Sequence, residues 1–201
     1  MTDQPAGLRQ RLIAVGVDLV STEGAQALSL REIARRAGVS HGAPRRYFPT
    51  HLELLSAIAR EGFAELAARV ATTADETDPR TRLTALAHAY VDFALANRGM
   101  YELMFRHDLL ESNRLGLRET SLPLFALLGE LIARIRPAQD PAVTAGALWA
   151  NLHGIVQLWH WNSLRLPTGI DRVEPLVRAA LDAHLGEPDA DVRGTRQGDP
   201  V

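Results

Sequence analysis

"LREIARRAGVSHGAPRRYF", residues 30–48, is the stretch that decides how this chain folds, because it places five arginines around a tight turn. Ser29 lies just before it, and with Glu32 it forms a capping-box pattern that predicts a helix start near the first of these residues. Gly38 is typical of a left-handed helix end. A second short helix is then expected over residues 41–48, so the stretch predicts two helices joined by a sharp turn.

The second of these helices contains no carboxylate, although the first turn of a helix usually attracts Asp or Glu. Their absence from residues 41–48 favours an anionic partner at this helix end. Gly42 leaves room for close backbone approach, Arg45 and Arg46 supply forked donors, and Tyr47 supplies a hydroxyl. The pattern predicts a helix-turn-helix that places its second helix in the major groove of double-stranded DNA. A solvated, arginine-rich helix pair without a partner is the alternative.

Charge is distributed unevenly along the 201 residues, whose formal net charge is −2. Residues 1–51 hold seven arginines against four acids, and residues 52–201 hold fifteen arginines against twenty acids. A basic end and an acidic end indicate different partners for the two parts. The chain has no cysteine, which excludes thiol chemistry and fits a reducing compartment. Its polar start and lack of a long apolar run predict a cytoplasmic protein without membrane contact.

Periodic apolar residues and capping signals predict helices along the rest of the chain, and no segment alternates as a strand would. The expected helices cover residues 7–22, 50–70, 79–97, 99–110, 117–136, 141–166 and 171–185. We therefore expect a DNA-binding domain over residues 1–51 and a ligand-binding and dimerisation domain over residues 52–186. Residues 187–201 are expected to be a disordered tail, because they offer little to bury.

The stretch "GALWANLHGIVQLWHWN", residues 146–162, is apolar or small on nearly every face of a helix. Such a helix is buried nearly all round, which in a chain of this size predicts contact with both a core and a second subunit. We expect it to pair with residues 171–185 in a four-helix bundle between two copies. The candidate interface residues are Gly146, Ala150, Gly154, Trp161, Val177 and Leu181.

A helical bundle of this kind commonly holds a ligand between its helices. The candidate residues for an apolar ligand pocket are Tyr90, Phe93, Met104, Phe105, Phe125, Trp149 and His153. For each of them, ordinary core packing is the alternative. His153 and His160 share a helix face without a third ligand nearby, so no metal is expected. No phosphate loop, nucleophile elbow or paired carboxylate with a base is found, so neither a cofactor nor an enzymatic activity is expected.

The segment "LSLREIARRAGVSHGAPRRYFPTHLELL", within residues 8–66, resembles the DNA-binding domain of the TetR (tetracycline repressor) family. The resemblance implies an all-α fold in which a three-helix helix-turn-helix domain is joined by a linking helix to a helical bundle that dimerises. His51 stands where the family usually has a phosphate-gripping Lys, and Pro44 and Arg45 also depart from the usual pattern. We expect Pro44 to leave the short helix intact. The family's other DNA-contacting positions correspond to Arg31, Ser40, His41, Gly42, Arg45, Arg46 and Tyr47.

Trp149, His153 and Gly154, together with "MYELMF" at residues 100–105, resemble the subset of the family whose C-terminal domain is named for a Trp-His-Gly motif. The resemblance implies a homodimeric, ligand-responsive regulator, most often a repressor. It would bind a near-palindromic operator and be released by a small, largely apolar effector. A transcriptional activator of the same fold, a helical ligand-binding protein without DNA recognition and an architectural DNA binder remain as alternatives.

Overall fold

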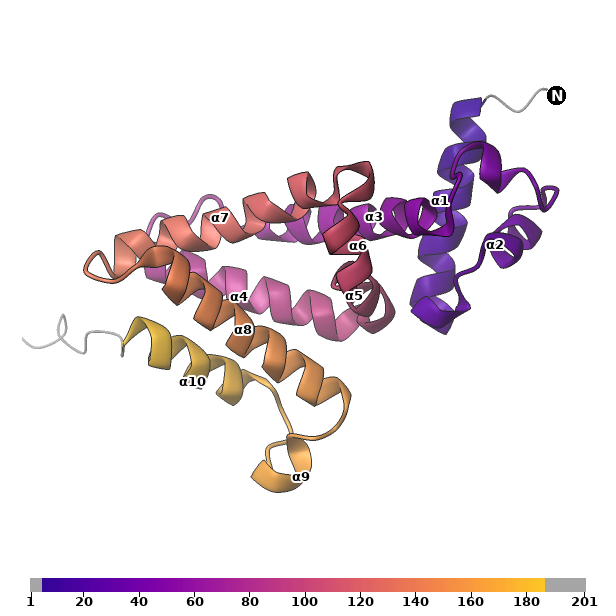
Figure 1. The fold of residues 1–201 in the computed structure, drawn as a ribbon. Coiled ribbons are helices and arrows are strands. Elements are labelled where there is room, and N and C mark those ends of the chain that lie inside the picture. The colour runs from indigo at the N-terminus through magenta and orange to yellow at the C-terminus, as the bar shows by residue number, and fades with distance from the viewer. Residues whose placement is uncertain (1–4, 187–201) are drawn as a thin grey trace, which may run out of the picture.

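Helices make up the architecture of the chain, with no strand in the part that the computed structural model describes, residues 5–186 (Figure 1). The N-terminal unit lies at one end of an elongated helical body, and the last two long helices run along one side of this body (Figure 1). The elements are α1 (Pro5–Glu23), η1 (Ala25–Ala27), α2 (Leu30–Arg36), η2 (Pro44–Arg46), α3 (His51–Ala71), α4 (Pro79–Ala96), α5 (Arg98–Met104), α6 (His107–Ser112), η3 (Arg114–Gly116), α7 (Leu117–Ile135), α8 (Pro141–His160), α9 (Arg165–Thr168) and α10 (Glu174–Leu185), in which η denotes a 3-10 helix.

The start of α2 confirms half of the predicted capping box. The Ser29 hydroxyl accepts a hydrogen bond from the Glu32 backbone N–H at 3.1 Å. The Glu32 carboxylate bonds instead to the side chains of Arg35 and Arg36. The helix is therefore capped by the serine, while the acid that would complete the box is used for ion pairing.

The end of α2 has the left-handed glycine that the sequence predicts. Gly38 has a φ of 66°, a conformation that costs glycine little. The Val39 N–H donates to the Ala34 carbonyl and the Gly38 N–H to the Arg35 carbonyl, which is the Schellman arrangement. The chain consequently turns sharply at the intended position.

The segment after this turn differs from the expected α-helix over residues 41–48. It consists of hydrogen-bonded turns followed by the 3-10 helix η2, and no side-chain cap from Ser40 is formed. Pro44 has no N–H to donate to the Ser40 carbonyl, so the first helical bond is missing and the Ala43 N–H bonds to that carbonyl instead. The expectation that the proline would leave an intact α-helix was wrong. We call residues 41–48 the reading segment.

The helix α3 links the N-terminal unit to the body (Figure 1). Thr50 and Glu53 form the complete capping box predicted at its start. Its residues from Leu54 to Ala59 are all buried, so the first turns of α3 serve the core shared with α1 and α2. The same helix then continues into the body, where Phe63, Leu66 and Val70 face inward.

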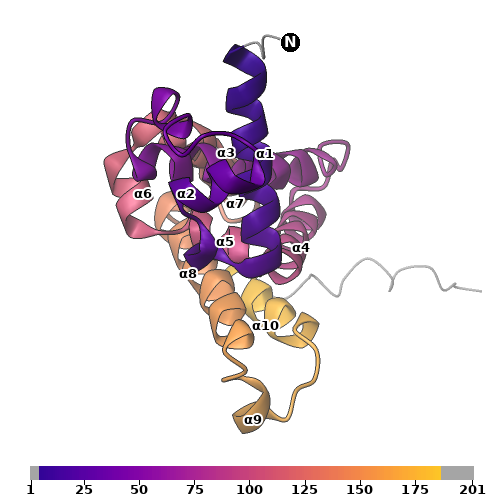
Figure 2. The same ribbon diagram turned by 90° about the vertical axis from the view of Figure 1, so that its right-hand side faces the viewer.

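The body is built from the second half of α3 with α4, α7 and α8, and α5 is inserted toward the N-terminal unit (Figures 1 and 2). One helix was expected over residues 99–110, but the chain breaks at Phe105 and Arg106 into α5 and α6. Arg106 is extended there and its guanidinium bonds to Asp108 in the first turn of α6. Neither Gly nor Pro marks the break, so no residue pattern indicated it.

The C-terminal helices α8 and α10 lie side by side, and α9 projects from the connection between them (Figures 1 and 2). The end of α10 is held by two guanidinium groups, from Arg80 in α4 and from Arg136 after α7. Each donates to the Leu185 carbonyl at 3.1 Å, and Arg80 also bonds to the Gly186 carbonyl. Positive charge at this position opposes the negative end of the helix dipole.

The expected tail, residues 187–201, lies outside the described residues. Within residues 5–186, no helix has both the length and the apolar character needed to cross a bilayer.

Candidate DNA-reading surface and ligand cavity

The inner side of the reading segment is fixed in the core. Pro44 is buried, and Phe48 retains 1% of its surface exposed. The Arg9 guanidinium of α1 lies over the Phe48 ring, 5.3 Å from its centroid. Phe48 thus packs in the core and attaches the segment to α1, although the segment is not a regular helix.

The outer side of the reading segment faces solvent. His41, Gly42, Arg45 and Arg46 are exposed, while Tyr47 is half-buried and packs against the core. Arg31 and Ser40, the other two positions implied by the family resemblance, are exposed as well. All eight predicted DNA-contacting residues are thus accessible to some degree. One of them, His51, also has a structural partner.

His51 is the first residue of α3, and its Nε2 lies 3.0 Å from the Leu28 carbonyl oxygen. This contact ties the start of the linking helix to the loop that precedes α2. The residue is exposed overall. Its expected role as a phosphate ligand stays a prediction.

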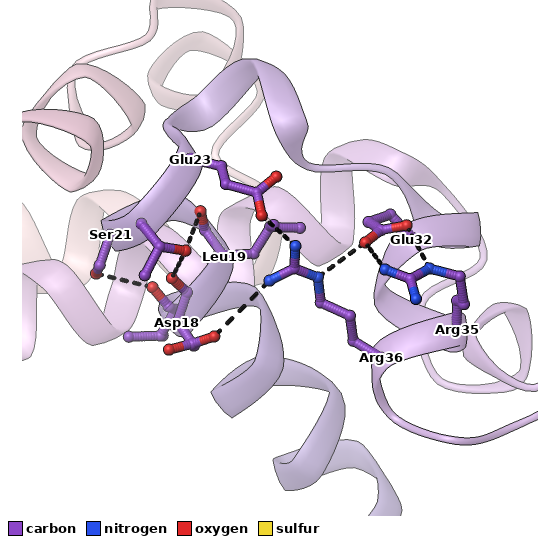
Figure 3. Close-up of polar contacts among 9 residues, drawn as sticks. Asp18, Leu19, Ser21, Glu23, Glu32, Arg35 and Arg36 are labelled. Atoms are coloured by element: carbon purple, nitrogen blue, oxygen red, sulfur yellow. Dashed lines mark hydrogen bonds and ion pairs between the residues drawn. The ribbon is translucent and has the colours of Figure 1, made fainter.

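Two arginines of α2 are occupied by carboxylates (Figure 3). Arg36 bonds to Glu32 at 2.8 Å and also pairs with Glu23 of α1, and its Nη1 lies 3.9 Å from Asp18. Arg35 bonds to the same Glu32 through two nitrogens. Hydrogen bonds from the two guanidinium groups lower the pKa of Glu32 to about 2, so this carboxylate is charged at any physiological pH. Arg36 thus joins α2 to α1, whereas Arg35 is paired within α2.

The other three arginines of this region are available to a partner. Arg31, Arg45 and Arg46 are exposed, and no carboxylate in residues 5–186 lies within ion-pair distance of them. We call them the free arginines. Their guanidinium groups have five donors each in a planar fork that matches phosphate or guanine. Of the five arginines in residues 30–48, two are therefore bonded to carboxylates and three are accessible to a partner.

A second site is an apolar cavity of about 270 Å³ between helices of the body, and two of its lining residues, Leu122 and Phe125, are exposed to solvent. Its walls come from α3, α4, α7 and α8, and from the short segments between α5 and α7. The described lining residues are Phe63, Leu66, Val70, Leu86, Ala87, Tyr90, Phe105, Leu110, Ser121, Leu122, Leu124, Phe125, Leu128, Trp149 and Leu152.

Beside this cavity lies a hydroxyl–imidazole cluster of Tyr90, Tyr101 and His153. The two hydroxyl oxygens are 3.0 Å apart, and His153 Nδ1 is 2.9 Å from that of Tyr90 and 2.6 Å from that of Tyr101. Burial raises the pKa of both tyrosines, and it lowers the pKa of His153. All three groups are consequently uncharged near neutral pH.

The predicted pocket residues fall into three groups: four line the cavity, one adjoins it, and two are absent from its described lining. Tyr90, Phe105, Phe125 and Trp149 line the cavity, as expected. His153 adjoins it through its contact with Tyr90.

Phe93 and Met104 are absent from the described lining of the cavity. Both are fully buried: the Arg69 guanidinium lies over the Phe93 ring, and Met104 packs where α5 crosses Gly62 of α3. These two residues serve core packing, which was the alternative interpretation for each of them.

Sequence reasoning missed the aliphatic half of the cavity and the role of Tyr101. Phe63, Leu66 and Val70 recur at helical spacing on α3, and Leu86 and Ala87 precede Tyr90 on α4. That spacing was sufficient to show an inward face, but the sequence held no signal that the faces of two separate helices border one cavity.

The predicted interface residues fall into two groups, one at least partly exposed and one buried within the chain. Trp161 is 62% exposed, Ala150 is exposed, and Gly146 and Gly154 are partly exposed. The prediction that Val177 and Leu181 lie at an interface was wrong. Both are buried within the chain and pack α10 against α8. The exposed residues of α10 include Ala179 and Ala183 on its other side.

A helical reading unit, a linking helix and a helical body with an internal cavity define a class of bacterial regulatory proteins. Residues 12–58 match the family described as "Bacterial regulatory proteins, tetR family", and residues 83–190 match "Tetracyclin repressor-like, C-terminal domain". The chain belongs to the TetR family. The second description does not mention the Trp-His-Gly subset, so that finer assignment stays a prediction.

Individual relatives agree with this assignment. The HTH-type transcriptional repressor Rv3405c of Mycobacterium tuberculosis is 26% identical over 190 residues, covering 86% of this chain and 89% of the relative. A solved structure of a protein with unknown function from Rhodococcus sp. RHA1 is 32% identical with a TM-score of 0.75, covering 90% of this chain and 97% of that one. The chain spans about half the length of the first curated relatives that it matches, 48% in one case.

The fold is also shared with AibR, whose structure was solved in complex with isovaleryl coenzyme A and operator DNA. That structure has a TM-score of 0.65 at 16% identity and covers 89% of this chain and 98% of AibR.

Proposed function

We propose that this protein is a ligand-responsive transcriptional repressor that binds a near-palindromic DNA operator as a homodimer. The observation that carries the DNA-binding part is the set of free arginines, exposed beside a reading segment without carboxylates while the neighbouring Arg35 and Arg36 are neutralised. A guanidinium group that is not paired with a carboxylate of the chain can donate its N–H groups to phosphate oxygens or to guanine. Two reading segments about 34 Å apart, or a multiple of this, would match successive turns of the duplex.

The effector part of the proposal rests on the cavity of about 270 Å³. A small, apolar ligand would stabilise a conformation in which the two reading segments no longer match the operator spacing, and α3 would transmit the change. The repressor name of the Mycobacterium relative, and the joint presence of a ligand and operator DNA in the AibR complex, support this interpretation.

Selection of bound fragments from genomic DNA tests the proposal. The purified chain without added ligand should enrich a small set of fragments that share a near-palindromic sequence. Competition with random duplex at physiological salt should leave these complexes in place. Enrichment without a shared sequence would instead indicate an architectural DNA binder, and no enrichment would leave only a ligand-binding protein.

Arg45→Ala should weaken binding to the selected operator by about 1 to 3 kcal/mol, because a free guanidinium fork is removed from the reading segment. Fluorescence anisotropy against the operator and against a random duplex distinguishes two roles. A base contact predicts a loss confined to the operator, and a phosphate contact predicts an even loss on both. Arg35→Ala is the matched control, because this guanidinium is already bonded to Glu32 and its loss should change affinity much less. Unchanged operator affinity in Arg45→Ala would remove this residue from the site.

The dimer part of the proposal rests on an outer stripe of α8. Its residues recur every three or four positions, apolar or small, on the side of α8 opposite its buried residues. Three of them, Val143, Leu158 and Trp161, have large exposed side chains, and Val143 has 68% of its surface exposed. The outer stripe consists of Val143, Ala147, Ala150, Gly154, Leu158 and Trp161. Ala179 and Ala183 of α10 extend the same kind of surface, so a second copy would complete a four-helix bundle.

Light scattering at micromolar concentration should give twice the chain mass of 22.0 kDa. Ala150→Arg should shift this value toward a single chain, because it places an unpaired charge in the centre of the outer stripe. Ala68→Arg, at an exposed position of α3, is the matched control and should leave the mass doubled. A wild-type protein that stays monomeric under these conditions would contradict the bundle.

A further inference from the structure

The cavity offers no charge to a ligand. No charged residue is found among its described lining residues, which are apolar apart from Tyr90 and Ser121. Nearby arginines have partners elsewhere: Arg118 donates to the Leu110 and Glu111 carbonyls, and Arg60 donates to the Leu115 carbonyl. A carboxylate or ammonium group placed beside the buried Tyr90 would therefore be without a counter-charge, which is strongly unfavourable.

Tyr90 supplies the polar end of the cavity. It lines the apolar space and also belongs to the hydroxyl–imidazole cluster with Tyr101 and His153. Trp149, another lining residue, packs beside the cluster, with its ring centroid 5.3 Å from that of His153. Tyr90 is thus the lining residue that connects the apolar wall to the polar cluster behind it, and Ser121 is the other polar lining residue. Sites that recognise one polar group on an apolar ligand have few polar groups of this kind.

The positions of the protons in the hydroxyl–imidazole cluster determine which hydrogen bonds it can make with a ligand. The three groups together carry two hydroxyl protons and one imidazole proton. If the imidazole proton is on Nδ1, that nitrogen donates to one tyrosine and this tyrosine donates to the other, which leaves one hydroxyl proton free. If the proton is on Nε2, then Nδ1 accepts and both hydroxyl protons are used within the cluster. The cluster can thus either donate to a carbonyl oxygen or accept from a hydroxyl, and in both forms it is uncharged.

The volume limits the size of the ligand. An apolar cavity of about 150 Å³ accommodates benzene, so about 270 Å³ corresponds to a body of roughly ten to twelve non-hydrogen atoms. A larger molecule would require the walls to move apart.

We propose that the effector is an uncharged molecule of this size, with an apolar body and one carbonyl or hydroxyl group that hydrogen-bonds to Tyr90. The inference rests on the proposed function, in which this cavity receives the effector. It assigns recognition to the hydroxyl–imidazole cluster and excludes free carboxylates and amines as ligands of the cavity.

Isothermal titration calorimetry on the full chain without DNA tests the ligand class, with nonan-2-one, nonan-1-ol, nonanoate and nonylammonium as probes of equal chain length. Near neutral pH, the ketone or the alcohol should bind at least roughly tenfold tighter than either ion, since the cavity has no counter-charge. Equal or tighter binding of either ion would overturn the proposal, as would the absence of binding by both neutral probes.

Tyr90→Phe tests the polar contact. It should weaken binding of the better neutral probe by about three- to tenfold, as expected for loss of one hydrogen bond, and leave binding of the apolar probe non-1-ene unchanged. Thr22→Val, which removes a hydroxyl group from an exposed position of α1 outside the cavity, is the matched control and should change neither. Equal affinity of wild type and Tyr90→Phe for the neutral polar probes would overturn the assignment of Tyr90. Because genomic selection uses protein without ligand and this titration uses protein without DNA, the proposed function and this inference can fail separately.

Discussion

Phe48→Ala should lower the free energy of unfolding by about 3 to 5 kcal/mol, the range for removing a large aromatic side chain from a packed core. The ring is 1% exposed and lies beneath the Arg9 guanidinium, so the substitution removes both packing and a cation–π contact. Urea denaturation followed by far-ultraviolet circular dichroism measures the loss.

Leu166→Ala is the control for Phe48→Ala, because Leu166 of α9 is 90% exposed and its truncation should change stability by no more than about 0.5 kcal/mol. Similar losses in the two variants would contradict the placement of Phe48. A folded Phe48→Ala protein should also bind the operator more weakly, because Pro44 and Phe48 together hold the free arginines Arg45 and Arg46 at the surface.

Gly99→Ala should destabilise the protein by about 1 to 3 kcal/mol, although alanine is the better helix former. A Cβ atom at this position of α5 would lie 2.3 Å from the Val20 carbonyl oxygen and 3.2 Å from the Gly24 Cα atom. Both are backbone atoms at the end of α1, which cannot rotate away as a side chain can. The substitution therefore forces α5 and α1 apart, and thermal or urea denaturation should show the loss.

Gly129→Ala provides the comparison for Gly99→Ala, because a Cβ atom at Gly129 of α7 meets nothing within 4 Å. This variant should be stabilised by up to about 1 kcal/mol, the usual gain from replacing a helical glycine. A gain in both variants would show that α5 and α1 have room to separate without cost.

The helix boundaries that the sequence predicts best are those set by local hydrogen bonds. Ser29, Thr50 and Asp78 each accept a bond from a first-turn N–H, and Gly38 has the left-handed conformation that ends α2. Such signals involve residues three or four positions apart, so one sequence is enough to find them.

Features that depend on distant parts of the chain were predicted less well. Arg36 was grouped with the other arginines by sequence, but its pairing with Glu23 requires α1 and α2 to be placed in space. Tyr101 was part of a recognised segment, yet its contact with His153 joins residues more than fifty positions apart. Val177 and Leu181 have the periodicity of an amphipathic helix, and periodicity alone does not say which apolar face a second subunit covers.

The guanidinium groups of Arg80 and Arg136 determine how two copies of the chain would meet. They attach the last turn of α10 to α4 and α7 of the same chain, so α8 and α10 are positioned before any second copy arrives. Dimerisation through these helices would then join preformed surfaces instead of coupling assembly to folding. Subunits could exchange between dimers without unfolding, and mixed dimers that contain a single altered reading segment could be prepared by combining two purified variants.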